Sequence, residues 1–282
     1  MIEFVPDWLI SSSRSLVILA PRTLTAAERV GAEVRESGLY ETMLARLQRL
    51  RGQAYLEDGA ITAADLTPDG RHRSAVDEQA WHVLSVEAGG VVRGCARYLA
   101  HEPTVSFGDL VVKNSALARD AVWGAPLRQA VEQEIRAARS MGLAYVEVGG
   151  WAIDKTMRFG TEALRIALGT YALSRRLGGC LGITTATVRH HSASTLLKIG
   201  GSMLECGGEP LPHYFDPQYR CDMAILRFRS AQASPRFESW VRCLDVQLRT
   251  APVIYHGVPV TLRRAAPPLG QPVRVRQVAA VA

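Results

Sequence analysis

Two features of the sequence could form a site for an anionic ligand. A double glycine, Gly149-Gly150, interrupts an apolar run typical of a strand. Glycine inside a strand often marks a bulge, or a place where a ligand approaches the backbone closely. A second run, from Arg158 to Ala163, is typical of the start of a helix, where unpaired N–H groups and the positive dipole end attract phosphate. Together they predict a phosphate-bearing ligand beside a bulged strand.

Ionisable side chains near these features add candidates for proton transfer. Glu147 lies on the glycine-containing strand, and a carboxylate buried there is costly unless it has a partner, which favours a functional role over an outward-facing position. His190 and His191 follow the next expected strand. Either could assist proton transfer because histidine titrates near neutral pH, although a solvated pair of loop histidines is the alternative.

The elements that must position these residues alternate between helix and strand. Leucines at helical spacing predict a helix over 40–56, and two β-branched runs joined by 88–90 predict a hairpin. Helices over 126–141 and 156–177 are expected to end at glycines. Further strands are expected at 143–153, 181–188 and 222–228, with a short helix at 192–201. This order predicts a mixed α/β domain on one sheet.

The same patterns divide the chain into four segments. Residues 1–39 are predicted to form an N-terminal helical extension, with a helix over 25–37. Residues 40–230 are the predicted main domain, and 231–263 a C-terminal extension packed on it. Residues 264–282 are rich in Pro, Ala, Val and Arg without periodicity, which predicts a flexible tail.

Composition narrows the class of protein. A hydrophobic fraction of 48% and a charged fraction of 21% are those of a soluble globular chain. The five scattered cysteines form no CxxC pair and have no His at zinc-ligand spacing, so we expect no metal and a cytoplasmic location. No apolar run reaches the roughly 20 residues of a membrane span, and no signal peptide is expected. A net charge of +6 suits coenzyme A, an acidic carrier protein or nucleic acid, and equally a surface without special meaning.

The glycine-containing strand and the following helix resemble the central motifs of the GNAT N-acyltransferase fold. The phosphate motif of that fold, R-x-x-G-x-A, reads here Arg158-x-x-Thr161-x-Ala163, with Thr in place of Gly. The ending of its next motif matches Lys198-Ile199-Gly200. The resemblance implies that the pantetheine arm of a thioester donor lies between the bulged strand and the next strand. An unrelated α/β domain with Arg and Thr at a helix start is the alternative.

Within that fold the sequence is similar to the acyl-homoserine lactone synthases and the long-chain N-acyl amino acid synthases, over Leu44 to Phe228. One departure is Gly150, which stands where those families usually have Arg. The residues that carry the similarity are Arg51, Tyr55, Gly59, Asp77, Gly94, Arg97, Glu147, Trp151, Ala152 and Ile153.

The resemblance implies the acylation of an amine, for which candidate residues can be named. That reaction needs a hydrogen-bond donor where negative charge develops on the thioester carbonyl, and a group that takes a proton from the ammonium. Backbone N–H groups of Trp151 and Ala152 are candidate donors, and Glu147 and His190 are the candidate catalytic side chains. Substrate binding is predicted for Arg97, Trp151, Asp77 and Tyr214. Donor binding is predicted for Trp151, Ala152, Ile153, Arg158, Phe159, Gly160, Thr161 and Thr187.

We therefore predict an N-acyltransferase that moves an acyl group from acyl-CoA or acyl-carrier protein to the amine of an amino acid or a similar small molecule. No permanently bound cofactor is expected, and a homodimer stays open. An acetyl-CoA-dependent N-acetyltransferase is one alternative. A non-catalytic basic nucleic-acid-binding protein is another, although the positive charge is dispersed and no nucleic-acid-reading motif appears.

Overall fold

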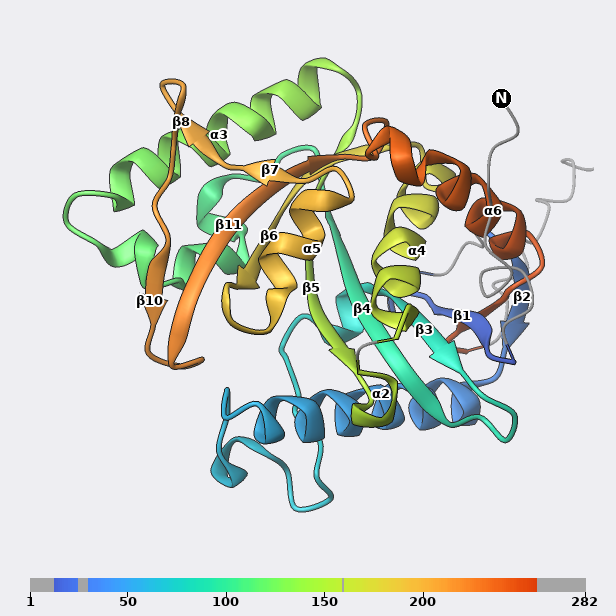
Figure 1. Cartoon of the computed structure of the whole chain (residues 1–282). Helices are drawn as coiled ribbons and strands as arrows, with labels where there is room; N and C mark the ends of the chain where they lie inside the picture. Colours follow the sequence, from blue (N-terminus) through green and yellow to red (C-terminus); the bar gives the residue numbers. More distant parts are fainter. Residues whose placement is uncertain (1–12, 25–29, 159, 258–282) are drawn as a thin grey trace, which may run out of the picture.

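A mixed sheet with helices on both faces forms the core of the computed structural model, which describes residues 13–24, 30–158 and 160–257, without the side chain of His190 (Figure 1). The predicted fold class is confirmed. In these ranges the sheet runs β10-β11-β6-β5-β4-β3-β1-β12-β2, and β7 pairs with β11. Its strands are β1 (Ser15–Leu19), β2 (Ala32–Arg35), β3 (Trp81–Val86), β4 (Val92–His101), β5 (Ala144–Ile153), β6 (Cys180–Thr187), β7 (Ser202–Met203), β10 (Tyr214–Asp216), β11 (Cys221–Arg229) and β12 (Pro252–Tyr255). A small second sheet pairs β8 (Glu205–Cys206) with β9 (Glu209–Pro210).

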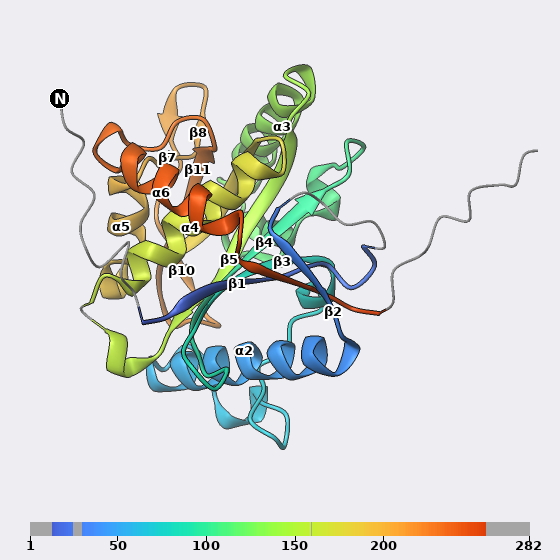
Figure 2. The same cartoon turned by 90° about the vertical axis from the view of Figure 1, so that its right-hand side faces the viewer.

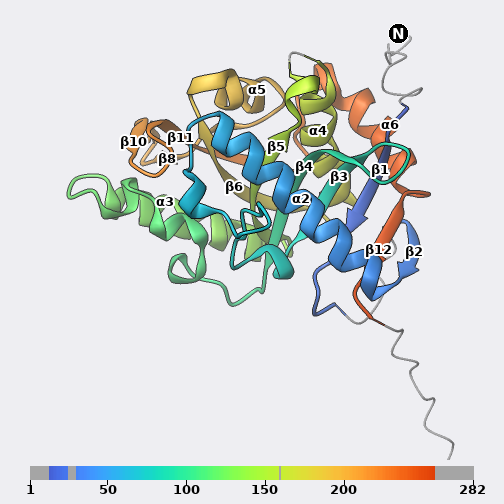
Figure 3. The ribbon, with the colours of Figure 1, turned by 90° about the horizontal axis from the view of Figure 1, so that it is seen from below.

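The helices divide between the two faces of the large sheet. Helices α2 (Ser37–Glu57) and α3 (Gly124–Ser140) lie on one face, and α4 (Glu162–Arg176), α5 (Ser192–Lys198) and α6 (Glu238–Leu248) on the other (Figures 2 and 3). Helix α4 is buried on most sides because it packs between the sheet and α6. None of the described helices combines the length and apolarity needed to cross a membrane.

Most of the predicted elements are present. The hairpin is β3 and β4, and the helices predicted over 40–56 and 126–141 are α2 and α3. The helix predicted over 156–177 begins only at Glu162, because 155–157 form a 3-10 turn. That turn is capped by the Asp154 side chain, which accepts a hydrogen bond from the Thr156 N–H.

Both predicted extensions need correction, because they supply strands to the same sheet. The helix predicted over 25–37 is wrong for Ala32–Arg35, which is β2, while 25–29 lie outside the described residues. Strand β12, from the predicted C-terminal extension, lies between β1 and β2 and is parallel to both. Strands β1, β12 and β2 therefore complete one edge of the sheet. The predicted tail at 264–282 lies outside the described residues.

Strands β5 and β6 separate halfway along their length. Their parallel pairing runs from Ala144 opposite Cys180 to Val148 opposite Thr184 and stops there, although both strands continue. The pairing of β5 with β4 shifts register at the same level, and Gly150 has φ of +61°. A bulge with glycine in the left-handed region bends a strand and increases its twist. The predicted bulge thus turns the end of β5 away from β6.

Gly150→Ala is expected to destabilise the fold by about 1–2 kcal/mol, because an L-residue in the left-handed region is strained. A Cβ there would also lie 3.3 Å from both Arg51 Nη1 and Arg97 Cβ. The free energy of unfolding in urea measures the effect.

Gly149→Ala is the matched control. Position 149 has no positive φ, and a Cβ there would meet only Arg97 Nη2, at 3.4 Å. Equal losses in the two variants would contradict this account of the bulge.

Candidate functional site

A cavity of about 280 Å³ passes through the sheet where β5 and β6 separate. Its walls come from both faces. On the α2 and α3 face they include Tyr55, Arg97, Val111, Val112, Ser115, Glu147, Ile183, Tyr219 and Met223. On the α4 and α5 face they include Ala167, Thr170, Thr184, Ala186, Ser192 and Leu196. A ligand entering from one face can therefore meet a ligand bound on the other.

Glu147 is a buried carboxylate in the wall of this cavity, with 8% of its surface exposed. Its Oε1 accepts a hydrogen bond from the Val112 N–H at 2.9 Å. Its Oε2 accepts one from the Val111 N–H at 2.8 Å and lies 3.0 Å from His101 Nε2. A carboxylate offers about four acceptor positions, so these three partners leave one for a ligand. Glu147 thus anchors the loop over the cavity, and its predicted catalytic role stays a prediction.

Asp77 is the centre of a buried ionic cluster beside the cavity. Arg51 Nη1 and Nη2 donate to its two oxygens at 2.8 and 2.6 Å. Gln48 and the Ser74 N–H donate to Oδ2 at 3.0 and 2.9 Å. Burial alone would raise the pKa of Asp77, but the hydrogen bonds and charge of Arg51 outweigh it and hold that pKa well below its usual value. Asp77 is therefore a permanent anion that neutralises Arg51.

Arg97, on β4, is the second cation of the cluster. Its Nη1 donates to Ser74 Oγ at 2.9 Å and lies 3.6 Å from Asp77 Oδ1. Its Nε is buried and has no hydrogen-bond partner among the described residues. Arg51 already forms the bidentate pair with Asp77, so the cluster holds two cations and one carboxylate. The cavity wall at Arg97 thus has an excess of positive charge and a free donor, which suits a carboxylate ligand.

Trp151 follows the bulge and also lines the cavity. Its indole Nε1 is buried and has no hydrogen-bond partner among the described residues. A buried indole N–H usually finds a partner, and this donor is left unsatisfied beside the cavity. Ala152 and Ile153 lie beyond the bulge, opposite Cys95 and Gly94 of β4, and do not line the cavity. Of the three, Trp151 is the one that a ligand in the cavity can touch.

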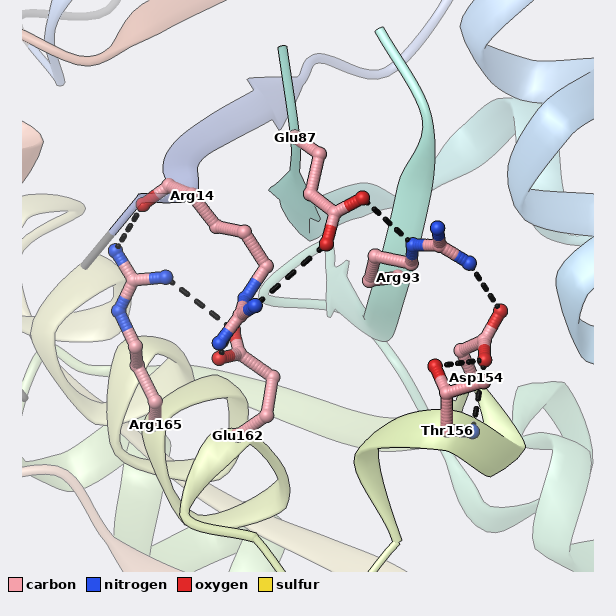
Figure 4. A network of polar contacts seen from close by, with 7 residues as sticks. All are labelled: Arg14, Glu87, Arg93, Asp154, Thr156, Glu162 and Arg165. Carbon is pink, nitrogen blue, oxygen red and sulfur yellow. Dashed lines mark hydrogen bonds and ion pairs between the residues drawn. The ribbon is translucent and has the colours of Figure 1, made fainter.

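The start of α4 is fixed by a chain of ion pairs (Figure 4). Glu162, in the first turn, is 3% exposed and pairs with Arg14 at 3.1 Å and Arg165 at 3.2 Å. Glu87 at the end of the β3 strand pairs with Arg14 and Arg93. Arg93 pairs in turn with Asp154 after β5. The network joins β1, the β3–β4 hairpin and the turn before α4, and so fixes the predicted phosphate loop relative to the sheet.

The predicted phosphate loop itself contacts the end of α2. Arg158 Nη2 lies 2.8 Å from Asp58 Oδ1 and 3.6 Å from Glu57 Oε2. Thr161 is the residue before the first turn of α4, and Phe159 lies outside the described residues. Arg158, Gly160 and Thr161 do not line the cavity, so their predicted role in donor binding concerns a place outside it and stays a prediction.

The structure gathers Arg97, Glu147, Trp151 and Thr187 around one cavity. Asp77 acts on it only through Arg51 and Arg97. Tyr214 is buried on β10 and does not line it, and His190 belongs to the 3-10 helix Arg189–His191, its side chain being outside the description.

Sequence reasoning missed several residues of the cavity. Arg189 Nη2 donates to the Asp58 carbonyl at 2.8 Å and to the Tyr219 carbonyl at 3.3 Å, and so joins three segments at the cavity wall. The rings of Tyr55 and Tyr219 meet edge to face, 6.1 Å apart. Val111 and Val112 begin the short 3-10 helix Val111–Asn114 and Ser115 follows it, where no periodic pattern marks them. For Tyr219 the sequence does hold a signal, the three aromatics Tyr214, Phe215 and Tyr219 close together before β11, and of these Tyr219 lines the cavity.

The fold is that of solved acyltransferase structures. No protein-family model matches the sequence, and no curated protein is similar to it. The structure of MesI, a CoA-dependent acyl-homoserine lactone synthase, matches with a TM-score of 0.51 and 16% identity, covering 82% of this chain and 95% of that one. The structure of BjaI, another such synthase, solved with SAM and isopentyl-CoA, matches with a TM-score of 0.49 and 15% identity, covering 87% of this chain and 94% of that one. The structure of FeeM, an N-acyl amino acid synthase from uncultured soil microbes, matches with a TM-score of 0.43 and 14% identity, covering 77% of this chain and 92% of that one. The likeness to MesI confirms the fold predicted from the resemblance.

The stability of the fold is expected to depend on pH, because His82 is buried beside Asp77 of the ionic cluster. Burial lowers the pKa of His82 from 6.5 to about 4, although its Nε2 donates to the Asp77 carbonyl at 2.8 Å. The unfolded chain then binds one more proton between these two values, so the free energy of unfolding falls as pH drops from about 6.5 to 4, by a few kcal/mol.

His82→Gln is expected to remove this fall in the free energy of unfolding between pH 6.5 and 4, as measured by urea titrations at several pH values. His213→Gln, at an exposed position, is the control, and a fall that persists in His82→Gln would contradict the assignment.

Proposed function

We propose that this protein is an N-acyltransferase that moves an acyl group from a thioester to the amine of a small molecule that also carries a carboxylate. The observation that carries the proposal is the cavity through the sheet between β5 and β6, with the excess cation of Arg97 in its wall. The cavity supports a reaction between a donor and an acceptor that enter from opposite faces. The fold shared with MesI supports the same class of reaction.

The acceptor binds on the α2 and α3 face. Its carboxylate accepts a hydrogen bond from the unpartnered Nε–H of Arg97. This hydrogen bond joins two charged groups in a buried place and is therefore strong. Its ammonium lies near Glu147, whose remaining acceptor position takes a proton directly or through a water. The neutral amine attacks the thioester carbon, a C–N bond forms, the C–S bond breaks, and the sulfur leaves as a thiol or thiolate. Donors near the bulge, including Trp151 Nε1, stabilise the charge that develops on the carbonyl oxygen.

The donor enters from the α4 and α5 face. Its pantetheine arm lies in the gap between β5 and β6, where unpaired backbone groups of β5 beyond Val148 can bind its amides. Acyl-CoA is the donor that the MesI and BjaI structures support, and an acyl-carrier protein would present the same arm. Either donor fits a cytoplasmic enzyme. Light scattering of the purified protein tests whether it forms a homodimer.

Mass spectrometry of reaction mixtures tests the proposal. Purified protein is incubated with acyl-CoA and acyl-carrier-protein donors and a pool of amino acids and amines. A new N-acyl amino acid supports the proposal and identifies donor and acceptor together. Products that form only from amines without a carboxylate would contradict the assignment of Arg97. An acetylated amine from acetyl-CoA alone would favour the acetyltransferase alternative.

Arg97→Gln is expected to raise the KM of the acceptor by at least about tenfold, because a hydrogen bond between charged groups is lost, while the KM of the donor stays unchanged. Steady-state kinetics with each substrate varied in turn measure both constants. Arg93→Gln is the matched control, since Arg93 lies on the same strand but belongs to the network at the start of α4. An equal rise in the KM of the donor would contradict the assignment of Arg97 to the acceptor's carboxylate.

Glu147→Gln is expected to lower kcat by about a hundredfold or more if the carboxylate takes the proton. The variant also loses stability, because an amide cannot accept from the Val111 and Val112 N–H groups with both of its ends. The free energy of unfolding in urea, measured beside kcat, separates the two effects. A variant that loses stability but keeps the wild-type kcat would assign Glu147 to holding the loop alone.

A further inference from the structure

An apolar pocket continues the cavity between α4 and α5. The two share Val148, Ala167, Thr170, Thr184 and Leu196 in their walls. The volume of the pocket is about 20 Å³, which is room for about one water-sized group. The pocket therefore starts at the gap between β5 and β6 and extends only a short way along the sheet.

Two aromatic rings bound the pocket beyond these shared residues. Tyr171 on α4 and Phe228 on β11 line it, with ring centroids 6.0 Å apart. The Phe228 ring cannot move toward the sheet, because it lies over Gly182 of β6, and a Cβ at Gly182 would be only 2.7 Å from the tip of that ring. Tyr171 is 5% exposed and packed in the main core cluster. Close packing thus holds Tyr171 in place, while Phe228 is half-buried and packs against the same cluster and over Gly182.

We propose that this pocket receives the end of the donor's acyl chain, and that Tyr171 and Phe228 restrict the enzyme to short acyl groups. The inference rests on the proposed function. An acyl chain that starts at the gap has two directions available. On the α2 and α3 face it would lie against Arg97 and Glu147 and separate these charged groups from their ligand, which is unfavourable. On the α4 and α5 face it meets apolar walls, and a long chain there would overpack the pocket.

The test compares acetyl-, butyryl-, octanoyl- and dodecanoyl-CoA as donors, with the acceptor held constant. For the wild-type protein we expect kcat/KM to fall at least about tenfold between butyryl and octanoyl, because the longer chain must displace packed rings. Phe228→Ala removes the ring that ends the pocket, and is expected to raise the octanoyl to butyryl ratio by at least about tenfold. Phe228→Leu, a smaller change, should shift the ratio in the same direction and covers the case in which the alanine variant does not fold.

Phe237→Ala is the matched control. Phe237 is a buried phenylalanine of the same core cluster, and its ring packs against Trp240, away from the pocket. It should lose stability as the Phe228 variants do but keep the wild-type preference. A change of chain preference in Phe237→Ala equal to that in Phe228→Ala would mean that general loosening of the core causes the shift, and would overturn the inference.

The outcomes separate this inference from the proposed function. If the wild-type protein transfers dodecanoyl as well as butyryl, the length limit is wrong and the acyltransferase assignment stands. If no donor gives product, the proposed function fails. Calorimetry with the same CoA thioesters then tests whether the pocket limits the length of the bound acyl chain. Binding that weakens with chain length in the wild type, and recovers in Phe228→Ala, supports the inference, whereas chain-independent binding or none overturns it.

Discussion

At Gly150 the backbone of β5 enters the left-handed region, and the register with β4 shifts at the same level. Every part of the candidate site depends on this bend. Beyond it β5 no longer pairs with β6, so the sheet opens and the cavity passes from one face to the other. Glycine is required there for two reasons, since φ is positive and a Cβ would meet Arg51 and Arg97. One residue thus couples the opening of the sheet to the position of the cationic cluster.

The polar groups on the two sides of this opening are fixed in different ways. On the α2 side, Arg51 and Asp77 are each about 1% exposed and form a bidentate pair, an arrangement that tolerates little movement because either partner alone would be an uncompensated buried charge. On the α3 side, Glu147 is held by backbone N–H groups of the loop at 111–112. The side of the cavity that we propose for the acceptor is therefore held in place before any ligand binds, which suits a site that positions an amine.

Local patterns predicted much of this fold. Helix α3, the β3–β4 hairpin and the bulge at Gly149-Gly150 are each set by residues close together in sequence, and so could be predicted. Strands β2 and β12 were not, because each has four residues and forms only through pairing with partners far along the chain. The site divides in the same way. Glu147, Arg97 and Trp151 are on strands with a readable pattern, whereas Arg189 and Val112 lie in 3-10 helices of three and four residues, too short to show one. The Arg158–Asp58 contact joins segments a hundred residues apart, which no local pattern can indicate.

The glycine at position 150 also bears on which acceptor the site can take. The lactone synthases and N-acyl amino acid synthases that the sequence resembles usually have an arginine there, and here a side chain at 150 would point at Arg51 and Arg97. A third guanidinium beside these two would face a cluster with a single carboxylate, Asp77, and the left-handed backbone would disfavour it further. Without it the cluster keeps one excess positive charge at Arg97. That charge matches an acceptor with one carboxylate, because binding this carboxylate leaves the cluster of Arg51, Asp77 and Arg97 electrically neutral. Within this cluster a second anionic group would find no partner, because the other cation, Arg51, is already neutralised by Asp77.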